Sequence, residues 1–257
     1  MLASRGKGGR GLPPGTDERN PGLAPGVRLL FSSDFHGSEV AFRGFARTLA
    51  GGPFEAGILA GDLLDEWLSA DQVDRLLGTS SPSVSTPEGR LTRALTVRRQ
   101  QLQSILEASG KPLFFVLGNH DVTPWPDTST MTNLDGAAVE FRGQRFVGYR
   151  WTRMDRYPEE LEADLPALAA LVDDRTILVT HSPPWGVLDG VPGSRFRFGL
   201  KTLHRVPTPR LHLFGHVHEC PGVQGNAING AWPALGRFFS VDPETLRAEV
   251  VDPLPSP

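Results

Sequence analysis

The chain alternates short apolar runs with longer stretches in which apolar residues recur every three or four positions. Five of the runs begin with mostly apolar residues, which is the pattern of strands buried on both faces of a sheet. Each run continues into Gly, Asp, Asn or His, so polar side chains are predicted at the points where the strands end and loops begin. The runs are VRLLFSSDFH (27–36), AGILAGDLLD (56–65), KPLFFVLGNHD (111–121), RTILVTHSPPW (175–185) and LHLFGHVHEC (211–220).

Three stretches between these runs have the spacing of helices that pack one face against a sheet. The first ends at Gly51 and the second ends before Gly110, while the third contains Pro166, which is expected to kink or split it. The apolar stripes are Phe42, Phe45 and Leu49; Leu91, Leu95, Leu102 and Leu106; and Leu161, Leu165, Leu168 and Val172. Strands that alternate with helices predict an α/β protein.

The remaining segments are predicted to be loops where hydrophobic residues show no regular spacing, and strands where hydrophobic and polar residues alternate. Residues 78–90 and 122–136 are polar and show no period, so both are predicted to be loops. Residues 141–151, 236–242 and 245–252 carry alternating or β-branched patterns. These three segments are predicted to add antiparallel strands to the sheets.

Composition bounds the domain organisation and the kinds of partner. A chain of 257 residues fits one domain, predicted over 27–257, and the Gly-, Pro- and Arg-rich residues 1–26 are expected to be a flexible tail. No secretory signal and no run of about 18 apolar residues is found, so no membrane association is expected. The formal net charge of -3 argues against long-range attraction to nucleic acid. Cys220 is the single cysteine, which favours a reducing, cytoplasmic location.

Acidic, amide and imidazole side chains follow the five predicted strands. In an open α/β sheet, ligands collect at the carboxyl ends of the strands, and residues two apart in an extended strand end point to the same side. The mixture of ligand types without a thiolate suits Mn, Fe or Zn. The residues are Asp34 and His36, Asp62, Asn119 and His120, His181, and His216 and His218.

In order and in flanking glycines, these residues resemble the calcineurin-like metallophosphoesterases, in their compact bacterial form. The family signature of D-x-H, G-D, G-N-H followed by D or E, a lone H, and G-H-x-H is matched from Asp34 to His218. The resemblance implies a four-layer α-β-β-α sandwich with two mixed β-sheets and two divalent metal ions at the carboxyl ends of the strands. It implies that Asp34, His36 and His218 bind one ion, that Asn119, His181 and His216 bind the other, and that Asp62 bridges both.

The resemblance also implies hydrolysis of a phosphate mono- or diester. Two divalent ions carry a charge of +4, and two carboxylates and a bridging hydroxide carry -3. The site would therefore keep a net charge of about +1, which attracts an anionic ester even though the chain is acidic overall. The bridging hydroxide would attack phosphorus in line. His120 would stay free of metal and protonate the departing oxygen, and the neighbouring Asp121 would orient it.

Two other functions stay open. A catalytically silent scaffold with this fold would bind partner proteins, although silent relatives usually lose ligands that are all present here. A nuclease is less favoured, because neither a capping domain nor a basic track is evident. The residues after Asp62 read Leu-Leu-Asp-Glu, without the basic residue of the Ser/Thr protein phosphatases, so a small phosphate ester is the expected substrate.

The remaining polar and aromatic residues are mostly interpreted as structural. Asp65 and Glu66 are interpreted as solvated or capping acids, His204 and His212 as packing or surface residues, and Cys220 as a packed thiol. Four further residues lie in loops near the ligands, and the sequence leaves open which of them line a substrate pocket. They are Trp125, Trp185, Arg195 and Arg197.

Overall fold

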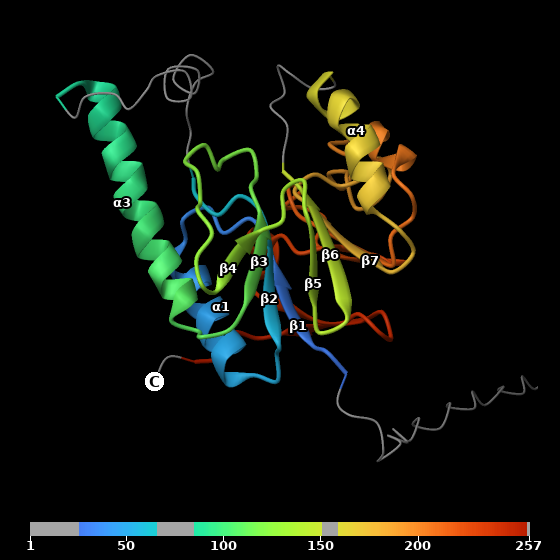
Figure 1. The fold of residues 1–257 in the computed structure, drawn as a ribbon, viewed down its shortest axis with the longest axis horizontal. Helices are drawn as coiled ribbons and strands as arrows, with labels where there is room; N and C mark the ends of the chain where they lie inside the picture. The colour runs from blue at the N-terminus through green and yellow to red at the C-terminus, as the bar shows by residue number, and fades with distance from the viewer. Residues whose placement is uncertain (1–25, 66–84, 151–158, 256–257) are drawn as a thin grey trace, which may run out of the picture.

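The computed structural model describes residues 26–65, 85–150 and 159–255, whose strands form two six-stranded sheets (Figure 1). The first sheet contains β1 (Leu29–Ser32), β2 (Ala56–Ala60), β3 (Leu113–Val116), β4 (Met131–Asn133), β11 (Phe238–Asp242) and β12 (Arg247–Val251). Its order is β12-β11-β1-β2-β3-β4. The strands from β1 to β4 are parallel, and β11 and β12 extend the sheet with antiparallel pairing.

The second sheet has the same mixed character. It contains β5 (Ala138–Phe141), β6 (Gln144–Tyr149), β7 (Thr176–Thr180), β8 (Leu211–Phe214), β9 (Gly222–Gln224) and β10 (Ala227–Asn229). Its order is β5-β6-β7-β8-β10-β9. The strands β6, β7, β8 and β10 are parallel, whereas β5 and β9 pair antiparallel at the two edges.

The five strands predicted from the apolar runs are confirmed as β1, β2, β3, β7 and β8, and all their residues are buried. The inner faces of the two sheets share one hydrophobic core, in which Phe31 and Ile58 of the first sheet meet Phe146 and Ile177 of the second. The other face of the first sheet packs against helices. Burial on both faces explains why these strands read as continuous apolar runs.

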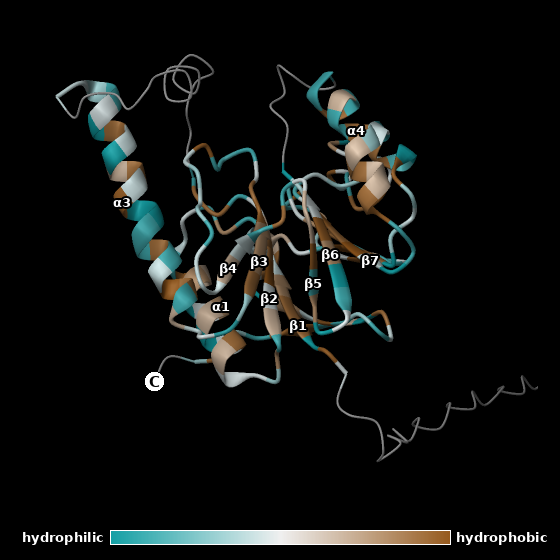
Figure 2. Cartoon of the chain, viewed as in Figure 1, coloured by the Kyte–Doolittle hydropathy of each residue, from teal (hydrophilic) through white to brown (hydrophobic). Residues whose placement is uncertain are grey.

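Helices cover the outer face of each sheet. α1 (Glu39–Gly51) and α3 (Pro87–Glu107) lie over the first sheet, while α4 (Glu159–Leu171) and the 3-10 helix η1 (Lys201–Arg205) lie over the second (Figure 1). A short helix, α5 (Trp232–Leu235), precedes β11. The predicted α-β-β-α sandwich with two mixed sheets is confirmed. Figure 2 shows hydrophobic residues concentrated in the central strands and hydrophilic and hydrophobic residues mixed along α3 and α4.

The predicted helical stripes agree with the structure to different degrees. Phe42, Phe45 and Leu49 of α1 are fully buried, and α1 ends at Gly51 as expected. In α3, Leu102 and Leu106 are buried, but the stripe is only partly buried toward the N-terminus at Leu91 and Leu95. In α4, Leu161, Leu165 and Leu168 are buried, and the helix is continuous through Pro166. No helix in the described ranges is long and apolar enough to cross a bilayer.

Three predictions, two about loops and one about an added strand, are wrong in part. Residues 87–90 belong to α3 and not to a loop, because the Thr86 side chain accepts a hydrogen bond from Gly89 N at 3.1 Å and caps the helix. The loop predicted over 122–136 contains β4, and β6, predicted to add antiparallel, pairs parallel with β7. The predicted tail lies outside the described residues except for Gly26, and so do residues 78–84.

Candidate metal centre

The side chains predicted to bind metal all lie just beyond strand ends. Asp34 and His36 follow β1, Asp62 follows β2, Asn119 follows β3, His181 follows β7, and His216 and His218 follow β8. Because parallel strands bring their carboxyl ends to one edge of a sheet, the loops meet there. The structure brings all seven side chains together, along with that of His120.

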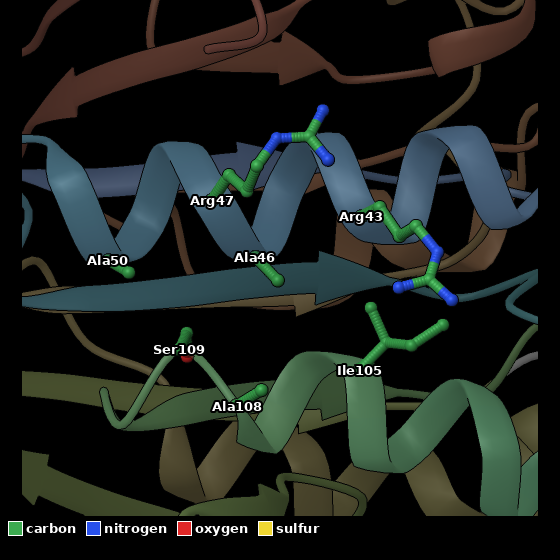
Figure 3. Close-up of a pocket in the computed structure, with 7 residues that line it drawn as sticks. All are labelled: Arg43, Ala46, Arg47, Ala50, Ile105, Ala108 and Ser109. Carbon is green, nitrogen blue, oxygen red and sulfur yellow. The ribbon is translucent and has the colours of Figure 1, made fainter. Parts of the chain in front are cut away.

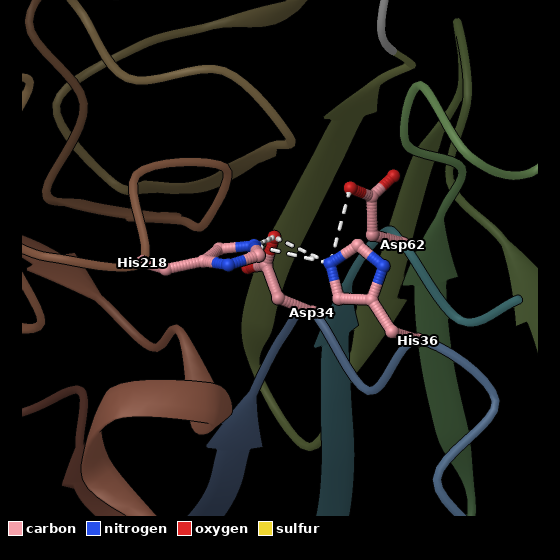
Figure 4. A group of neighbouring side chains, drawn as sticks. All are labelled: Asp34, His36, Asp62 and His218. Atoms are coloured by element: carbon pink, nitrogen blue, oxygen red, sulfur yellow. Dashed lines mark hydrogen bonds and ion pairs between the residues drawn. The ribbon is translucent and has the colours of Figure 1, made fainter. Parts of the chain in front are cut away.

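Four of these side chains form one close group, shown in Figure 4. Candidate ligand atoms of Asp34, His36, Asp62 and His218 all lie within 4.8 Å of one another. Nε2 of His36 lies 3.0 Å from Nε2 of His218 and 3.7 Å from Oδ2 of Asp62. Nε2 of His218 lies 3.1 Å from Oδ1 of Asp34. Two buried carboxylates and two imidazoles that converge in this way fit a divalent cation.

The other three side chains form a second group beside the first. Nε2 of His181 lies 2.8 Å from Oδ1 of Asn119, and Nδ1 of His216 lies 2.9 Å from the same oxygen. Oδ2 of Asp62 lies 3.4 Å from Nε2 of His181 and 3.7 Å from Nε2 of His36. The carboxylate of Asp62 therefore lies between the two groups, although the assignment of each residue to one ion stays a prediction.

The environment of His181 favours a cation. Its Nδ1 lies 2.8 Å from the carbonyl oxygen of Ala60, to which it donates, so Nε2 faces the site. In a neutral ring this nitrogen presents a lone pair to the oxygens of Asn119 and Asp62, and either a proton or a cation relieves the repulsion. Burial lowers the pKa of His181, but the charge of Asp62 and a hydrogen bond to it outweigh burial and raise the pKa to about 9. The site thus stabilises positive charge here.

Hydrogen bonds hold the two buried carboxylates in place. Asp34 accepts from the hydroxyl of Ser33 at 2.5 Å and from the backbone N–H of His216 at 3.0 Å. Asp62 accepts from the backbone N–H of His120 at 2.8 Å. Burial opposes the charge of Asp62, yet the nearby His181 holds its pKa well below the usual range. Burial lowers the pKa of His216 to about 4, which keeps its ring neutral, as a metal ligand requires.

Backbone strain is concentrated at this site. Among the described residues, seven non-glycine residues have a positive φ, and four of them are candidate ligands: Asp34 (59°), His36 (46°), Asp62 (51°) and His216 (70°). Such conformations disfavour L-residues and persist where the surroundings impose them. Gly118 explains part of the crowding, because a Cβ there would approach the carboxylate and the backbone nitrogen of Asp62 to under 3.0 Å.

Asp65 is a site residue that the sequence reading missed. Its Oδ1 lies 3.4 Å from Nδ1 of His36 and 3.9 Å from Nδ1 of His120, and the two rings lie 4.9 Å apart. The Asp65 side chain is 45% exposed, which agrees with its interpretation as a solvated acid, but it also lies beside two histidines of the site. The available signal was its position three residues after Asp62, in the same loop. Glu66, interpreted in the same way, lies outside the described residues.

Asp121 is buried and joins two loops of the site. Its carboxylate accepts backbone N–H groups of Leu63 at 3.1 Å, Leu64 at 2.7 Å and Gly118 at 2.9 Å. Burial, reinforced by the charge of Asp62, raises the pKa of Asp121 to about 7. These bonds connect the loop after β2 to the loop after β3. Orientation of the His120 ring by Asp121 stays a prediction.

The aromatic residues whose roles the sequence left open lie in different environments. Trp125 is buried and stacks on Phe42 with ring centroids 6.3 Å apart, so it belongs to the core. Trp185 is partly exposed, and Nζ of Lys201 lies 4.7 Å from the centre of its ring. Arg197 pairs with Asp189 at 2.5 Å. The structure therefore excludes Trp125 from a substrate pocket and leaves Trp185 at the surface.

The residues interpreted as structural, Asp65 apart, have structural contacts. The Cys220 thiol is partly buried and donates to the carbonyl of Gly190 at 2.5 Å. His212 is buried, and its Nε2 lies 2.9 Å from the hydroxyl oxygen of Thr180. Exposed His204 bonds through its ring to a backbone carbonyl. Arg195 is exposed in the loop before β8.

A cavity of about 340 Å³ lies between α1 and α3, away from the strand ends that carry the candidate ligands (Figure 3). It is lined by Arg43, Ala46, Arg47, Ala50, Ile105, Ala108 and Ser109. None of these residues is a candidate ligand or the predicted proton donor. The cavity is therefore separate from the candidate metal centre.

Comparison with known proteins agrees with this geometry. A family model described as calcineurin-like phosphoesterase matches residues 27–220. Metallophosphoesterase domain-containing protein 1 of Homo sapiens is 39% identical over 143 residues, which cover 50% of this chain and 42% of that protein. UPF0046 protein K07C11.7 of Caenorhabditis elegans is 34% identical over 124 residues, covering 45% of this chain and 42% of that protein. The matched region thus spans less than half the length of these curated relatives.

Solved structures share the fold at low sequence identity. The crystal structure of TT1561 of Thermus thermophilus matches with a TM-score of 0.60 and 16% identity, over 89% of this chain and 100% of that chain. A further crystal structure matches with a TM-score of 0.67 and 14% identity, over 89% of this chain and 100% of its own. These likenesses concern the two-sheet sandwich alone.

Proposed function

This chain belongs to the calcineurin-like phosphoesterase family, and from that premise we propose that it hydrolyses a small phosphate mono- or diester with two divalent metal ions. One observation carries the proposal. Seven potential ligands from five loops converge, and the carboxylate of Asp62 lies between the two groups they form. A structural role requires no such convergence of buried carboxylates and imidazoles on backbone conformations that are disfavoured.

The proposal divides the ligands between the two ions. Asp34, His36 and His218 would hold one ion, Asn119, His181 and His216 would hold the other, and Asp62 would serve both, in keeping with the close approach of these side chains. Mn, Fe or Zn suits this oxygen and nitrogen set. When bound, such ions supply Lewis acidity, which activates water and neutralises charge on a phosphate. The chain's own contribution is to fix the ligands through Ser33, Ala60 and the backbone around them.

His120 is the proposed proton donor to the departing oxygen. Its ring lies 4.9 Å from that of His36, at the edge of the first group. Asp65, near Nδ1 of both rings, is the proposed positioning carboxylate for His120. An imidazole held beside the ions is placed to protonate the leaving oxygen.

Charge supports a small anionic substrate over a nucleic acid. The formal net charge is -3, so attraction of an anion depends on the proposed ions and not on the whole molecule. A single cysteine fits a reducing compartment, and we place the proposed activity in the cytoplasm on that ground.

Metal removal tests the proposal directly. Protein supplied with Mn is expected to hydrolyse p-nitrophenyl phosphate or bis(p-nitrophenyl) phosphate, to lose the activity after rigorous chelation and to regain it when Mn returns. The variant Asp34→Asn is expected to be inactive, while Asp174→Asn, at an exposed acid outside the site, should behave like the unchanged protein. Full activity in metal-free protein would contradict the proposal. Bound metal without turnover of any ester in a broad screen would instead favour the scaffold function.

A further inference from the structure

The segment that follows His181 returns to the metal centre and carries exposed aromatic side chains. Among the described residues, the exposed large hydrophobic side chains include three aromatic ones: Trp185 (38% exposed), Phe196 (76%) and Phe198 (47%). All three lie in the segment 183–200, which we call the aromatic loop. Singly scattered apolar residues are ordinary on a surface, so an exposed aromatic residue is a candidate for ligand contact only where its ring also lies against the reactive site.

The aromatic loop is held rigidly. The buried carboxylate of Asp189 accepts the backbone N–H of Gly186 at 2.8 Å and pairs with Arg197. The backbone N–H of Phe198 donates to the carbonyl of Asp189 at 2.8 Å. A Cβ on Gly199 would come within 3.0 Å of that carboxylate, so the two sides of the loop are closely packed. The position of Phe198 is therefore set in advance of any ligand.

The loop is also tied to the segment that carries two candidate ligands, His216 and His218. The thiol of Cys220 donates to the carbonyl of Gly190 at 2.5 Å. The amide of Asn229 donates to the carbonyl of Val217 at 2.9 Å and, more weakly, to that of Leu188 at 3.4 Å. These bonds fix the loop relative to the metal centre.

Phe198 is the exposed aromatic residue that reaches this centre. Its ring lies 6.1 Å from that of His216, nearly perpendicular at 82°. The contact uses one part of the Phe198 ring and leaves 47% of the residue exposed. Aromatic rings pair at centroid separations of about 4.5–7 Å, so the uncovered part of Phe198 is available to a second ring next to the site.

We infer that Phe198 determines specificity by receiving an aromatic ring carried by the organic group of the ester, beside His216. The inference rests on the proposed phosphoesterase function and names the class of substrate for the same site: phosphate esters with a planar aromatic ring, phenyl or heteroaromatic. Phe196 belongs to the same loop but is more exposed, and no contact between its ring and a candidate ligand is seen in the described residues.

The test compares benzyl phosphate with cyclohexylmethyl phosphate, or their methyl diesters if the protein cleaves only diesters. The two organic groups match in size and release alkoxides of similar basicity, so only the aromatic character differs. The unchanged protein is expected to prefer the benzyl ester in kcat/KM. Phe198→Ala should lower kcat/KM for the benzyl ester about three- to tenfold, mainly through KM, with a smaller effect on the cyclohexylmethyl ester.

Further variants separate aromatic contact from general damage. Phe198→Trp should keep the benzyl preference, Phe198→Leu should lose it, and Phe196→Ala should behave like the unchanged protein. Metal content should stay unchanged in all of them. An equal loss for both esters in Phe198→Ala, or equal effects of Phe196→Ala and Phe198→Ala, would overturn the inference and leave the phosphoesterase proposal intact. Absence of turnover of every ester by the metal-loaded unchanged protein would overturn the proposed function and this inference with it.

Discussion

At the scale of single residues, the carboxylate of Asp62 is the one that lies near histidines of both ligand groups. Its oxygens lie near nitrogens of both ligand groups, and one of them accepts the backbone N–H of His120. A side chain shared by two ions differs in its consequences from one that contacts a single ion.

Replacement of Asp62 should therefore affect both proposed ions. Asp62→Ala is expected to reduce bound metal from about two equivalents to near zero, whereas His218→Ala should leave about one. Elemental analysis of the purified variants measures this, and circular dichroism confirms that each remains folded. Equal losses in two folded variants would contradict the bridging assignment.

His120 should matter for proton transfer and not for metal binding. His120→Asn is expected to keep its metal but to slow hydrolysis of esters with alkoxide leaving groups by about 10²–10⁴. Nitrophenyl esters, whose leaving group departs readily as an anion, should be slowed much less. Rates for the two substrate classes measure the difference.

Equal slowing of both classes would assign His120 to charge stabilisation on phosphorus instead. Loss of metal together with activity would make His120 a ligand, and the division between seven ligands and one metal-free histidine would have to be changed.

At the scale of elements, short turns at the strand ends bring the ligands together. The turn after β3 passes so close to Asp62 that Gly118 leaves no room for a side chain, whereas a Cβ on Gly190 would meet nothing closer than 3.6 Å. Close packing of loops thus sets the spacing of the ligands, and not the strands alone.

Gly118→Ala is therefore expected to force apart the loops after β2 and β3. The predicted effects are a loss of about 1–3 kcal/mol in the free energy of unfolding and weaker metal binding. Denaturant unfolding and metal titration measure the two effects. Gly190→Ala is the matched control and should change neither much. If the Gly118→Ala protein were as stable and bound as much metal as the unchanged protein, the loops would be able to move apart at little cost, and the prediction would be wrong.

At the scale of the whole molecule, the second sheet buries an ionisable ring away from the metal centre. His212 in β8 is buried, its Nε2 is 2.9 Å from the hydroxyl oxygen of Thr180, and burial lowers its pKa to about 3. Because that hydroxyl donates to the carbonyl of Ser182, it accepts from the Nε2–H of His212. The lowered pKa keeps the ring neutral at neutral pH.

This burial predicts a contribution to acid sensitivity. An unfolded histidine has a pKa near 6.5, so the unfolded chain takes up a proton below that pH while folded His212 stays neutral down to about pH 3. The contribution to stability is complete above pH 6.5 and falls by up to about 1.4 kcal/mol per pH unit between those values. His212→Gln, which keeps a donor toward Thr180, should show a shallower decline. Denaturant unfolding from pH 7 to pH 4 measures both slopes, and identical slopes would contradict the prediction.

The order of apolar and polar residues along the chain is enough to predict the buried strands, the α/β class and the set of residues that the fold brings together. These features are local: a strand buried on both faces must be continuously apolar, and a ligand two residues from another at a strand end shares its direction. The amino-acid pattern alone therefore assigns Asp34, Asp62 and His181 to loop positions at strand ends.

The neighbours of those residues, in contrast, follow from the three-dimensional fold. Asp65 lies beside His36 and His120, and Asp121 joins two loops through backbone N–H groups. Trp125 lies in the core, and Phe198 lies against His216. Each of these contacts depends on how a loop packs against segments that are distant in the sequence. Loop residues show no hydrophobic periodicity, so their contacts cannot be predicted from the local sequence.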